Sequence, residues 1–369
     1  MTRLHRYLFF QFLSAVAFAC LAITIVVWFS QAIRMMSLVI NNGGSLMSFL
    51  ALMVLLLPTF MPLLLPVSLA VGVMFVFHRL ITESELVVMR AAGMSPMDIT
   101  KPALALAAMI AGLGYFLTVI VAPVANHEFV RLQYEIRSDL SMLMLHTGSF
   151  NDVSKGLTFY ARDRGSNGDL RGILIHDTRK AGHPTTIMAN SGELVHAPEG
   201  PRILVHHGMR QEIDSATGQL SQLSFEGYMV DLSSIGGSFD QRWIEPRERS
   251  MLQLIAKPTN QPDTANRQRF LSEFHMRLTL PFLAFTFTLV VCVVALTGNF
   301  DRRGMLLRVI IGALAISAIE AGLLTAVNLM AKQGWMVVVL YAVVFAPVPF
   351  LYQRLMQDGL RRPTQEVPA

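Results

Sequence analysis

The stretch that decides how this chain is organised is Thr82-Glu83-Ser84-Glu85-Leu86-Val87-Val88-Met89-Arg90-Ala91-Ala92-Gly93-Met94-Ser95. It is a short charged segment between two long apolar ones. Thr82 followed by Glu85 has the spacing of a capping box, which begins a helix. Gly93 suits the left-handed position just after a helix end, and Ser95-Pro96 is typical of the next helix start. Residues 82–93 therefore predict a short helix between two membrane spans.

The exposed surface of this short helix is the first candidate site. Glu83 and Glu85 fall in its first turn, where the helix dipole favours negative charge. Helical spacing places four further residues on one face: Leu86, Met89, Arg90 and Gly93. Apolar side chains in such a loop must be covered, either by the protein's own spans or by a partner. The sequence leaves these two alternatives equally open.

Outside this segment the chain is too apolar for a soluble protein. Of its 369 residues, 53% are hydrophobic and 15% are charged, and the mean hydropathy is +0.48. Long apolar runs with few or no charged residues, enough to cross an apolar layer of about 30 Å, recur along it. They predict six spans, at residues 7–33, 46–77, 102–124, 278–296, 305–329 and 335–351. Pro58, Pro62 and Pro66 in the second run predict a long helix that is kinked or broken.

Residues 126–270 differ in kind. Short runs of alternating or β-branched residues, separated by turn signals such as Asn167-Gly168, predict an all-β sandwich or roll. The strands are expected at 157–161, 170–177, 185–189, 193–196, 202–212 and 220–231, followed by a linker at 257–269. We therefore predict an α-helical membrane protein in three parts. Residues 1–125 and 271–369 are three-span halves, and 126–270 form an all-β domain between them.

The distribution of basic residues predicts the orientation. One set of short loops and termini contains Arg3, Arg6, Arg79, Arg90, Lys101, Arg302, Arg303, Arg354, Arg361 and Arg362. The short loops of the other set contain Arg34 and Lys332. Cytoplasmic loops are enriched in Lys and Arg. Both termini and the short helix are therefore expected in the cytoplasm, and the β domain in the periplasm.

The sequence excludes several classes of function. It contains no GxxxxGK[ST], HExxH or GxSxG motif, so no catalytic residue, nucleotide site or cofactor is expected. Cys20 and Cys292 lie inside apolar spans, which argues against a disulfide framework or a CxxC metal site. His206 and His207 are adjacent, and adjacent strand residues point to opposite faces, so no metal site is expected there either. The basic surplus belongs to the membrane part and indicates topology, not nucleic-acid binding.

Polar residues within or beside the spans are the second candidate site. Glu320 lies in the middle of the fifth span, where an acid is costly and faces protein or a water-filled cavity. A structural hydrogen bond to a neighbouring helix is the plainer interpretation. Gln31 and Arg34 lie near the outer boundary of the first span, where Arg34 can extend to headgroups or bind a lipid phosphate. Glu273 and Arg277, spaced i, i+4, predict a local ion pair before the fourth span.

The segment from Thr82 to Gly93 resembles the cytoplasmic coupling helix of the LptF/LptG permease family, and the resemblance extends over essentially the whole chain. The Thr-Glu-Ser-Glu start, Glu273 with Arg277, and Asn299 to Gly304 are more similar to the LptF branch. The resemblance implies a periplasmic β-jellyroll and an inner-membrane permease subunit for lipopolysaccharide.

The resemblance also implies partners. They are an LptG-like permease, an LptB-like ATPase dimer beneath the membrane, and an LptC-like protein that receives lipopolysaccharide in the periplasm. By the same resemblance, Glu85 contacts the ATPase, flanked by Glu83 and Arg90. The first span of the family usually carries more basic residues near its outer end. Here Ala32 occupies a position near Arg34 that can be basic, so phosphate recognition leans on the partner permease.

Three other functions fit parts of the pattern. A membrane sensor with a periplasmic ligand-binding β domain is the main alternative, but it would not need a capped apolar helix or six spans. A lipid-modifying enzyme would need several acids, His or Ser at one membrane depth, and Glu320 stands alone in the sequence of the spans. A different transporter permease, such as a lipoprotein-release type, would be expected to have fewer spans.

Overall fold

The computed structural model describes residues 3–41, 45–141, 147–154, 156–165, 169–179, 182–197, 200–214, 217–231, 242–258, 260–297 and 305–360. The predicted joint from Asn299 to Gly304 lies outside these residues. The chain forms two compact units. The first unit is helical and comprises residues 1–34, 53–128 and 244–369; the second comprises 35–52 and 129–243 and contains a sheet.

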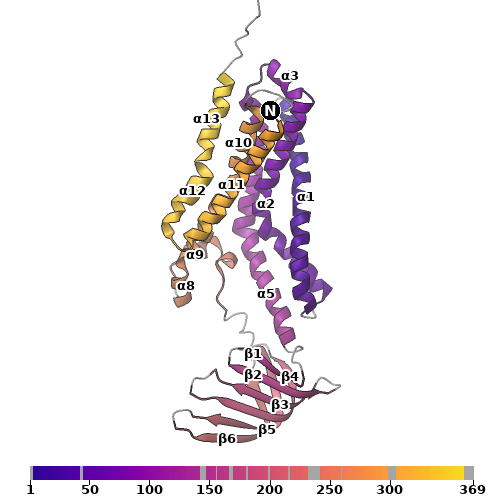
Figure 1. The fold of residues 1–369 in the computed structure, drawn as a ribbon, viewed down its shortest axis with the longest axis vertical. Helices are drawn as coiled ribbons and strands as arrows, with labels where there is room; N and C mark the ends of the chain where they lie inside the picture. The colour runs from indigo at the N-terminus through magenta and orange to yellow at the C-terminus, as the bar shows by residue number, and fades with distance from the viewer. Residues whose placement is uncertain are drawn as a thin grey trace, which may run out of the picture. The chain divides into compact units, whose positions relative to one another are not determined.

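The first half of the chain supplies three of the long helical stretches (Figure 1). They comprise α1 (Arg3–Asn41), α2 (Leu46–Thr82) and α4 (Pro96–Phe116), the last continued by a π-helical turn (Leu117–Val121) and α5 (Ala122–Ser141); α3 (Glu85–Ala91) lies between α2 and α4. Helix α2 continues through Pro58, Pro62 and Pro66, so of the two predicted forms, kinked or broken, the broken one is absent. Gly72 permits close packing of α2 on α1, since a Cβ there would lie 2.6 Å from the Val16 Cα.

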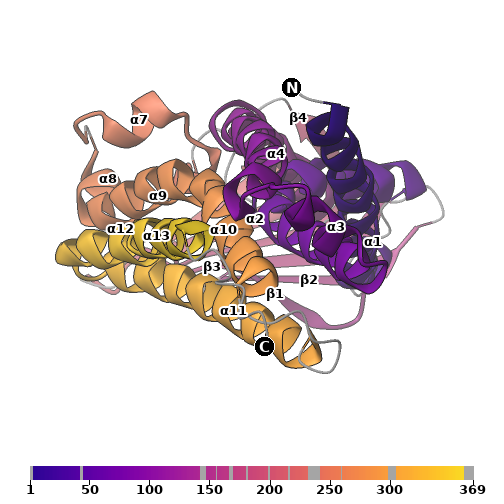
Figure 2. The same cartoon turned by 90° about the horizontal axis from the view of Figure 1, so that it is seen from above.

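The second half begins with short helices. They are η3 (Pro246–Glu248), α7 (Met251–Ile255), α8 (Gln261–Ala265), α9 (Arg267–Thr279) and η4 (Leu280–Phe282). They are followed by α10 (Leu283–Leu296), α11 (Met305–Met330), the 3-10 turn η6 (Gly334–Met336), α12 (Val337–Phe345) and α13 (Pro347–Leu360). In the helical unit, α9–α13 gather beside α1–α4 (Figure 2).

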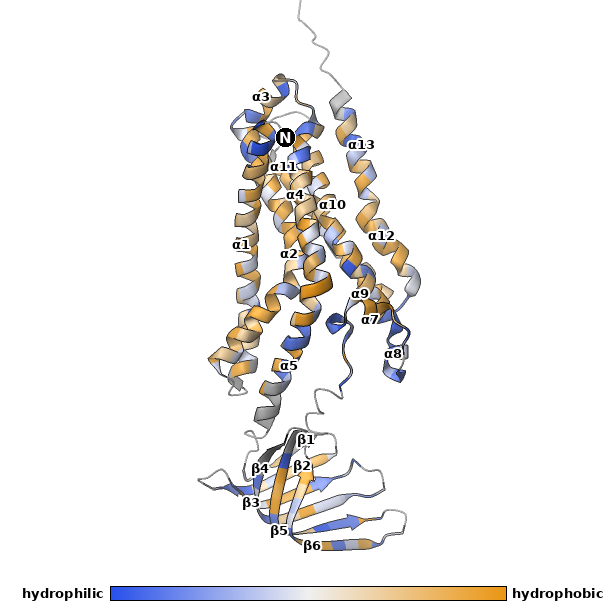
Figure 3. Cartoon of the chain, turned by 180° about the vertical axis from the view of Figure 1, so that it is seen from behind, coloured by the Kyte–Doolittle hydropathy of each residue, from blue (hydrophilic) through white to orange (hydrophobic). Residues whose placement is uncertain are grey.

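Six helical stretches of the described chain are long and apolar enough to cross a membrane, which confirms the predicted six spans. The ribbon in Figure 3, coloured by hydropathy, shows mainly hydrophobic residues along them. The stretch formed by α9, η4 and α10 is the most enclosed, and within it Thr286 and Cys292 have no exposed surface. The Thr286 hydroxyl donates to the carbonyl of Val344 on α12, at 2.9 Å, so this span is tied to the last one by a buried hydrogen bond.

The sheet unit confirms the predicted β-strand region, but its described strands form one sheet, and the unit also contains helical residues of α1, α2 and α5. Its strands are β1 (Phe150–Ser154), β2 (Leu157–Arg164), β3 (Leu170–Asp177), β4 (Thr185–Ala197), β5 (Gly200–Ile213) and β6 (Leu220–Asp231). They form one antiparallel sheet in chain order. Alternate residues such as Leu157, Phe159 and Ala161 are buried on one face, as the period of a half-buried strand requires.

Two sequence predictions for this region are corrected. Residues 185–189 and 193–196, expected as separate strands, are one continuous strand β4, because Gly192 pairs with Val205 without interrupting the ladder. The expected linker at 257–269 instead contains α8 and the first turn of α9. Strand β1 had no counterpart among the predicted strands.

Candidate functional site

The helix predicted at 82–93 is present as α3, but the predicted capping box is wrong. Helix α2 continues through Thr82, whose hydroxyl donates to the His78 carbonyl at 2.9 Å and is therefore not a cap. The N-cap of α3 is Ser84, which adopts a left-handed conformation (φ 61°) without a side-chain cap bond. The helix consequently starts at Glu85, with Glu83 in the turn that joins it to α2.

The other end of α3 follows the prediction. Gly93 is left-handed (φ 87°), and the Met94 amide donates back to the Met89 carbonyl at 3.2 Å. This is the bonding pattern of a Schellman-type helix end. Ser95 caps α4, and its capping box with Asp98 is complete. Because both joints are hydrogen-bonded, α3 is fixed between α2 and α4.

The apolar residues of α3 point in two directions. Leu86 (0% exposed) and Met89 (7%) belong to the core of the helical unit, together with Phe77 of α2. Their own spans therefore cover the predicted apolar face. Val87 and Val88 are 51% and 67% exposed, and neither was among the predicted site residues. Their adjacency to the buried positions was the available signal.

The carboxylates at the start of α3 lie beside polar groups of α1 and α2. Glu83 accepts a hydrogen bond from the Arg79 guanidinium at 2.9 Å, and both side chains are largely exposed. The Tyr7 hydroxyl of α1 donates to both Glu85 oxygens, at 3.3 and 3.4 Å. Exposed pairs of this kind contribute little stability, about 0–1 kcal/mol. Both carboxylates are therefore available to a partner at small cost.

Arg90 points into the helical unit. Its Nη2 donates to the Leu296 carbonyl at 2.6 Å. Leu296 is the last residue of α10, and the final carbonyls of a helix lack partners within the helix and carry its negative dipole end. A guanidinium is well suited to this position. Arg90 thus ties α3 to the most enclosed span, 206 residues further along the chain.

The lipid-cavity candidates lie on different helices. Gln31 on α1 lines a small crevice against α2, with Trp28, Phe60 and Leu64 among its neighbours. Arg34 is exposed three residues further along α1. Glu320 is half-buried on α11, in the second half of the chain. None of the described contacts brings Glu320 together with Gln31, so the structure does not assemble one polar site from them.

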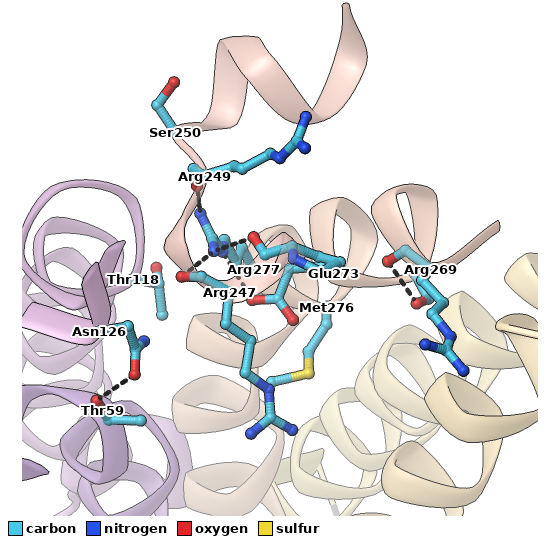
Figure 4. Close-up of polar contacts among 12 residues, drawn as sticks. Thr59, Thr118, Asn126, Arg247, Arg249, Ser250, Arg269, Glu273, Met276 and Arg277 are labelled. Atoms are coloured by element: carbon cyan, nitrogen blue, oxygen red, sulfur yellow. Dashed lines mark hydrogen bonds and ion pairs between the residues drawn. The ribbon is translucent and has the colours of Figure 1, made fainter. Parts of the chain in front are cut away.

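A cluster of hydrogen bonds lies before the fourth span (Figure 4). Only its i, i+4 ion pair could be predicted from sequence spacing. The predicted ion pair is confirmed, with Arg277 Nε 2.9 Å from Glu273 Oε1. In addition, the Arg277 guanidinium donates to the carbonyls of Arg249 (2.7 Å), Arg247 (3.0 Å) and Pro246 (3.2 Å). Arg277 is 4% exposed. We call residues 244–250 with Glu273 and Arg277 the strap clasp.

Three further contacts hold the strap clasp in place. Arg249 makes a two-pronged ion pair with Asp263, at 2.8 and 3.0 Å, and its guanidinium lies over the Phe270 ring. Glu248, whose side chain is 1% exposed, lies 3.4 Å from His127 Nδ1 on α5. The segment that enters the second half of the chain is thereby bound to a helix of the first half.

Six apolar spans and an inserted β domain define an integral membrane protein with a large extramembrane unit. Residues 6–352 match the profile of the family described as lipopolysaccharide export system permease LptF/LptG, and the chain belongs to that family. Family members are integral inner-membrane permeases of lipopolysaccharide export, and this function holds for the chain at that level.

Individual relatives are more distant. An uncharacterised protein of Rickettsia prowazekii is 25% identical over 302 residues, which cover 81% of this chain and 83% of the relative. The lipopolysaccharide export system permease protein LptF of Escherichia coli (strain K12) is 24% identical over 293 residues, covering 78% and 77%. The protein of the same name from Shigella flexneri has the same identity and coverage.

Proposed function

We propose that this chain is the LptF-like subunit of an ATP-driven exporter that extracts lipopolysaccharide from the inner membrane and passes it to a periplasmic bridge. It pairs with an LptG-like permease above an LptB-like ATPase dimer, and an LptC-like protein receives the lipid. The observation that carries the proposal is the presentation of α3. A short helix fixed at both ends, with the turn before it, presents the exposed Glu83 carboxylate, the partly exposed Glu85 carboxylate and two exposed valines.

The geometry supports different roles for the outward and the inward residues of the coupling helix. Glu83, Glu85, Val87 and Val88 form the outward surface that enters a groove of the ATPase. Leu86 and Met89 bind the helix to its own spans from behind, so that a push on it displaces the spans. Gly93 ends the helix, and Arg90 carries the displacement to α10.

The orientation and the lipid path follow from the same proposal. Helix α3 contacts Tyr7 near the N-terminus and Leu296 at the end of α10. These three elements therefore lie at one end of the helical unit. The basic residues of the short loops support a cytoplasmic location for this end. Gln31, Arg34 and Glu320 then face the cavity that takes up lipopolysaccharide, and the β domain is periplasmic.

The test is Glu85→Lys, which reverses the charge on the proposed contact without touching the core. We expect the protein to insert and fold, while copurification of the ATPase and ATP-dependent lipopolysaccharide release are lost. Asp163→Lys is the matched control, since Asp163 is an exposed carboxylate on β2 with 73% of its side chain accessible. Normal export by the Glu85→Lys variant would refute the assignment.

A further inference from the structure

The single turn α7 displays apolar side chains outside the spans. Leu254 is fully buried against the helical unit, but Leu252 is 81% exposed and Ile255 is 48% exposed. Ile244, at the start of the strap clasp, is 40% exposed. Leu252 and Ile255 are three residues apart and share a face. In the described chain Leu252 and Ile255 form an exposed apolar ledge on one face of α7, which we call the α7 ledge. Ile244 instead lines a crevice with Gln253 and Lys257.

Contacts to α9 fix the level of the α7 ledge along the helices. Arg267, the first residue of α9, donates to the carbonyls of Leu254 (3.1 Å), Ile255 (3.1 Å) and Ala256 (2.9 Å). α7 and α9 accordingly lie side by side (Figures 2 and 3). The residue after Arg267 is Gln268, which packs so closely on Gly334 that a Cβ there would lie 3.1 Å from its amide.

Gly334 marks a boundary of the apolar layer. It lies in the tight turn between α11 and α12, where the chain leaves one apolar helix and enters the next. The neighbouring Trp335 is 63% exposed, and Lys332 precedes it. Trp is enriched at the membrane–water boundary, and Lys near a span end extends into the headgroups. Since Gln268 lies at this turn, the α7 ledge lies at the same level.

The ledge is held rigidly at that level. A helical turn of five residues is not stable by itself in water. Here it is capped by Ser250 and Gln253, which exchange hydrogen bonds of 2.9 and 3.4 Å, and its last carbonyls are bound by Arg267. The strap clasp fixes the residues before it. Several ordered contacts therefore maintain an exposed Leu252, which is unfavourable in water.

Charge near the ledge complements a lipid surface. Arg247, Lys257 and Arg269 are exposed in the same part of the chain. The exposed acid Glu245 uses its carboxylate in the η3 capping box, and Asp263 is paired with Arg249. Apolar side chains beside exposed cations are the pattern of segments that lie in the interface of an anionic bilayer.

We infer that the α7 ledge is an interfacial anchor. Leu252 and Ile255 lie in the headgroup–acyl boundary of the phospholipid bilayer, and Arg247 and Lys257 contact lipid phosphates. The anchor fixes the segment that leads into the fourth span at a constant depth. It depends on the membrane placement of the six spans and not on the ATPase partner proposed above, so the two proposals fail independently.

The test places an environment-sensitive fluorophore on a cysteine at position 252. The background is Cys20→Ala with Cys292→Ala, and the full chain is assembled with its copurifying partners in nanodiscs containing anionic phospholipid. The control position is Gln261, an exposed residue of α8 that lies outside the capping box of α7. Each position is measured with a doxyl-labelled lipid, whose quencher sits at shallow depth, and with iodide, which quenches from water.

We expect the probe at 252 to be quenched more by the shallow lipid and less by iodide than the probe at 261. Lys257→Glu should reduce the lipid quenching at 252. Equal iodide quenching at the two positions would overturn the inference, because Leu252 would then face water. Quenching by neither agent in the assembly, with iodide access restored in the isolated chain, would also overturn it and assign the ledge to a protein partner.

Discussion

Replacing Arg277 by alanine tests the strap clasp most severely. The substitution removes four hydrogen bonds, one to Glu273 and three to the carbonyls of Pro246, Arg247 and Arg249. The Glu273 side chain is 14% exposed, so its carboxylate stays largely buried without a counter-charge. Breaking such a pair costs about 3–5 kcal/mol. Since about 1.4 kcal/mol is tenfold, the open state of the clasp should increase by about two to three and a half powers of ten.

Hydrogen–deuterium exchange of peptides covering residues 244–258 measures this opening directly. Exchange within β2–β5 serves as the internal reference, because those strands belong to the other unit. Arg79→Ala is the matched control, since it breaks an exposed i, i+4 pair with Glu83 and should cost no more than about 0.5 kcal/mol. The reasoning is refuted if Arg277→Ala leaves the exchange of 244–258 at the wild-type rate, or if Arg79→Ala raises it equally.

Two other substitutions follow from contacts between helices. Arg90→Ala should leave the ATPase bound but lower lipopolysaccharide release per ATP hydrolysed, because the tie from α3 to the Leu296 carbonyl is lost; unchanged coupling in a reconstituted complex would contradict it. Gly72→Leu should lower the melting temperature and yield of the purified protein, because any Cβ there meets the Val16 backbone at 2.6 Å. A Cβ at Gly112 would lie in open space, so Gly112→Leu should retain the melting temperature and the yield. Equal losses in the two variants would refute the packing argument.

The parts of the fold that sequence predicts well depend on local composition. Apolar runs with few or no charges, about as long as the apolar layer is thick, identified all six spans, and alternation identified most strands. The same local rules failed at Thr82, where the preceding helix continues and its hydroxyl bonds back to His78. Residues 257–269 looked like a linker because of their polar composition, yet Asp263 and Arg267 bind groups elsewhere in the helical unit and order the segment.

The candidate site was predictable in position but not in direction. The spacing of Leu86 and Met89 correctly placed them on one face, yet periodicity does not say whether that face meets a partner or the protein's own spans. Arg90 is the sharper case. The carbonyl that accepts its hydrogen bond is 206 residues away, and no residue near Arg90 in the sequence predicts this contact. The three carbonyl bonds of Arg277 are equally non-local, whereas its i, i+4 pair with Glu273 was predictable.

The measurement that tests the central claim most directly is affinity purification of the tagged chain from its native membrane, beside the Glu85→Lys variant. Mass spectrometry identifies the bound proteins and lipids, and ATP is then added to the particles. We predict that the wild-type chain retains a second six-span permease, a stoichiometric ATPase and lipopolysaccharide, and that ATP drives lipid release. The variant should retain the permease and lose the ATPase. A wild-type chain that purifies without any ATPase would contradict the account.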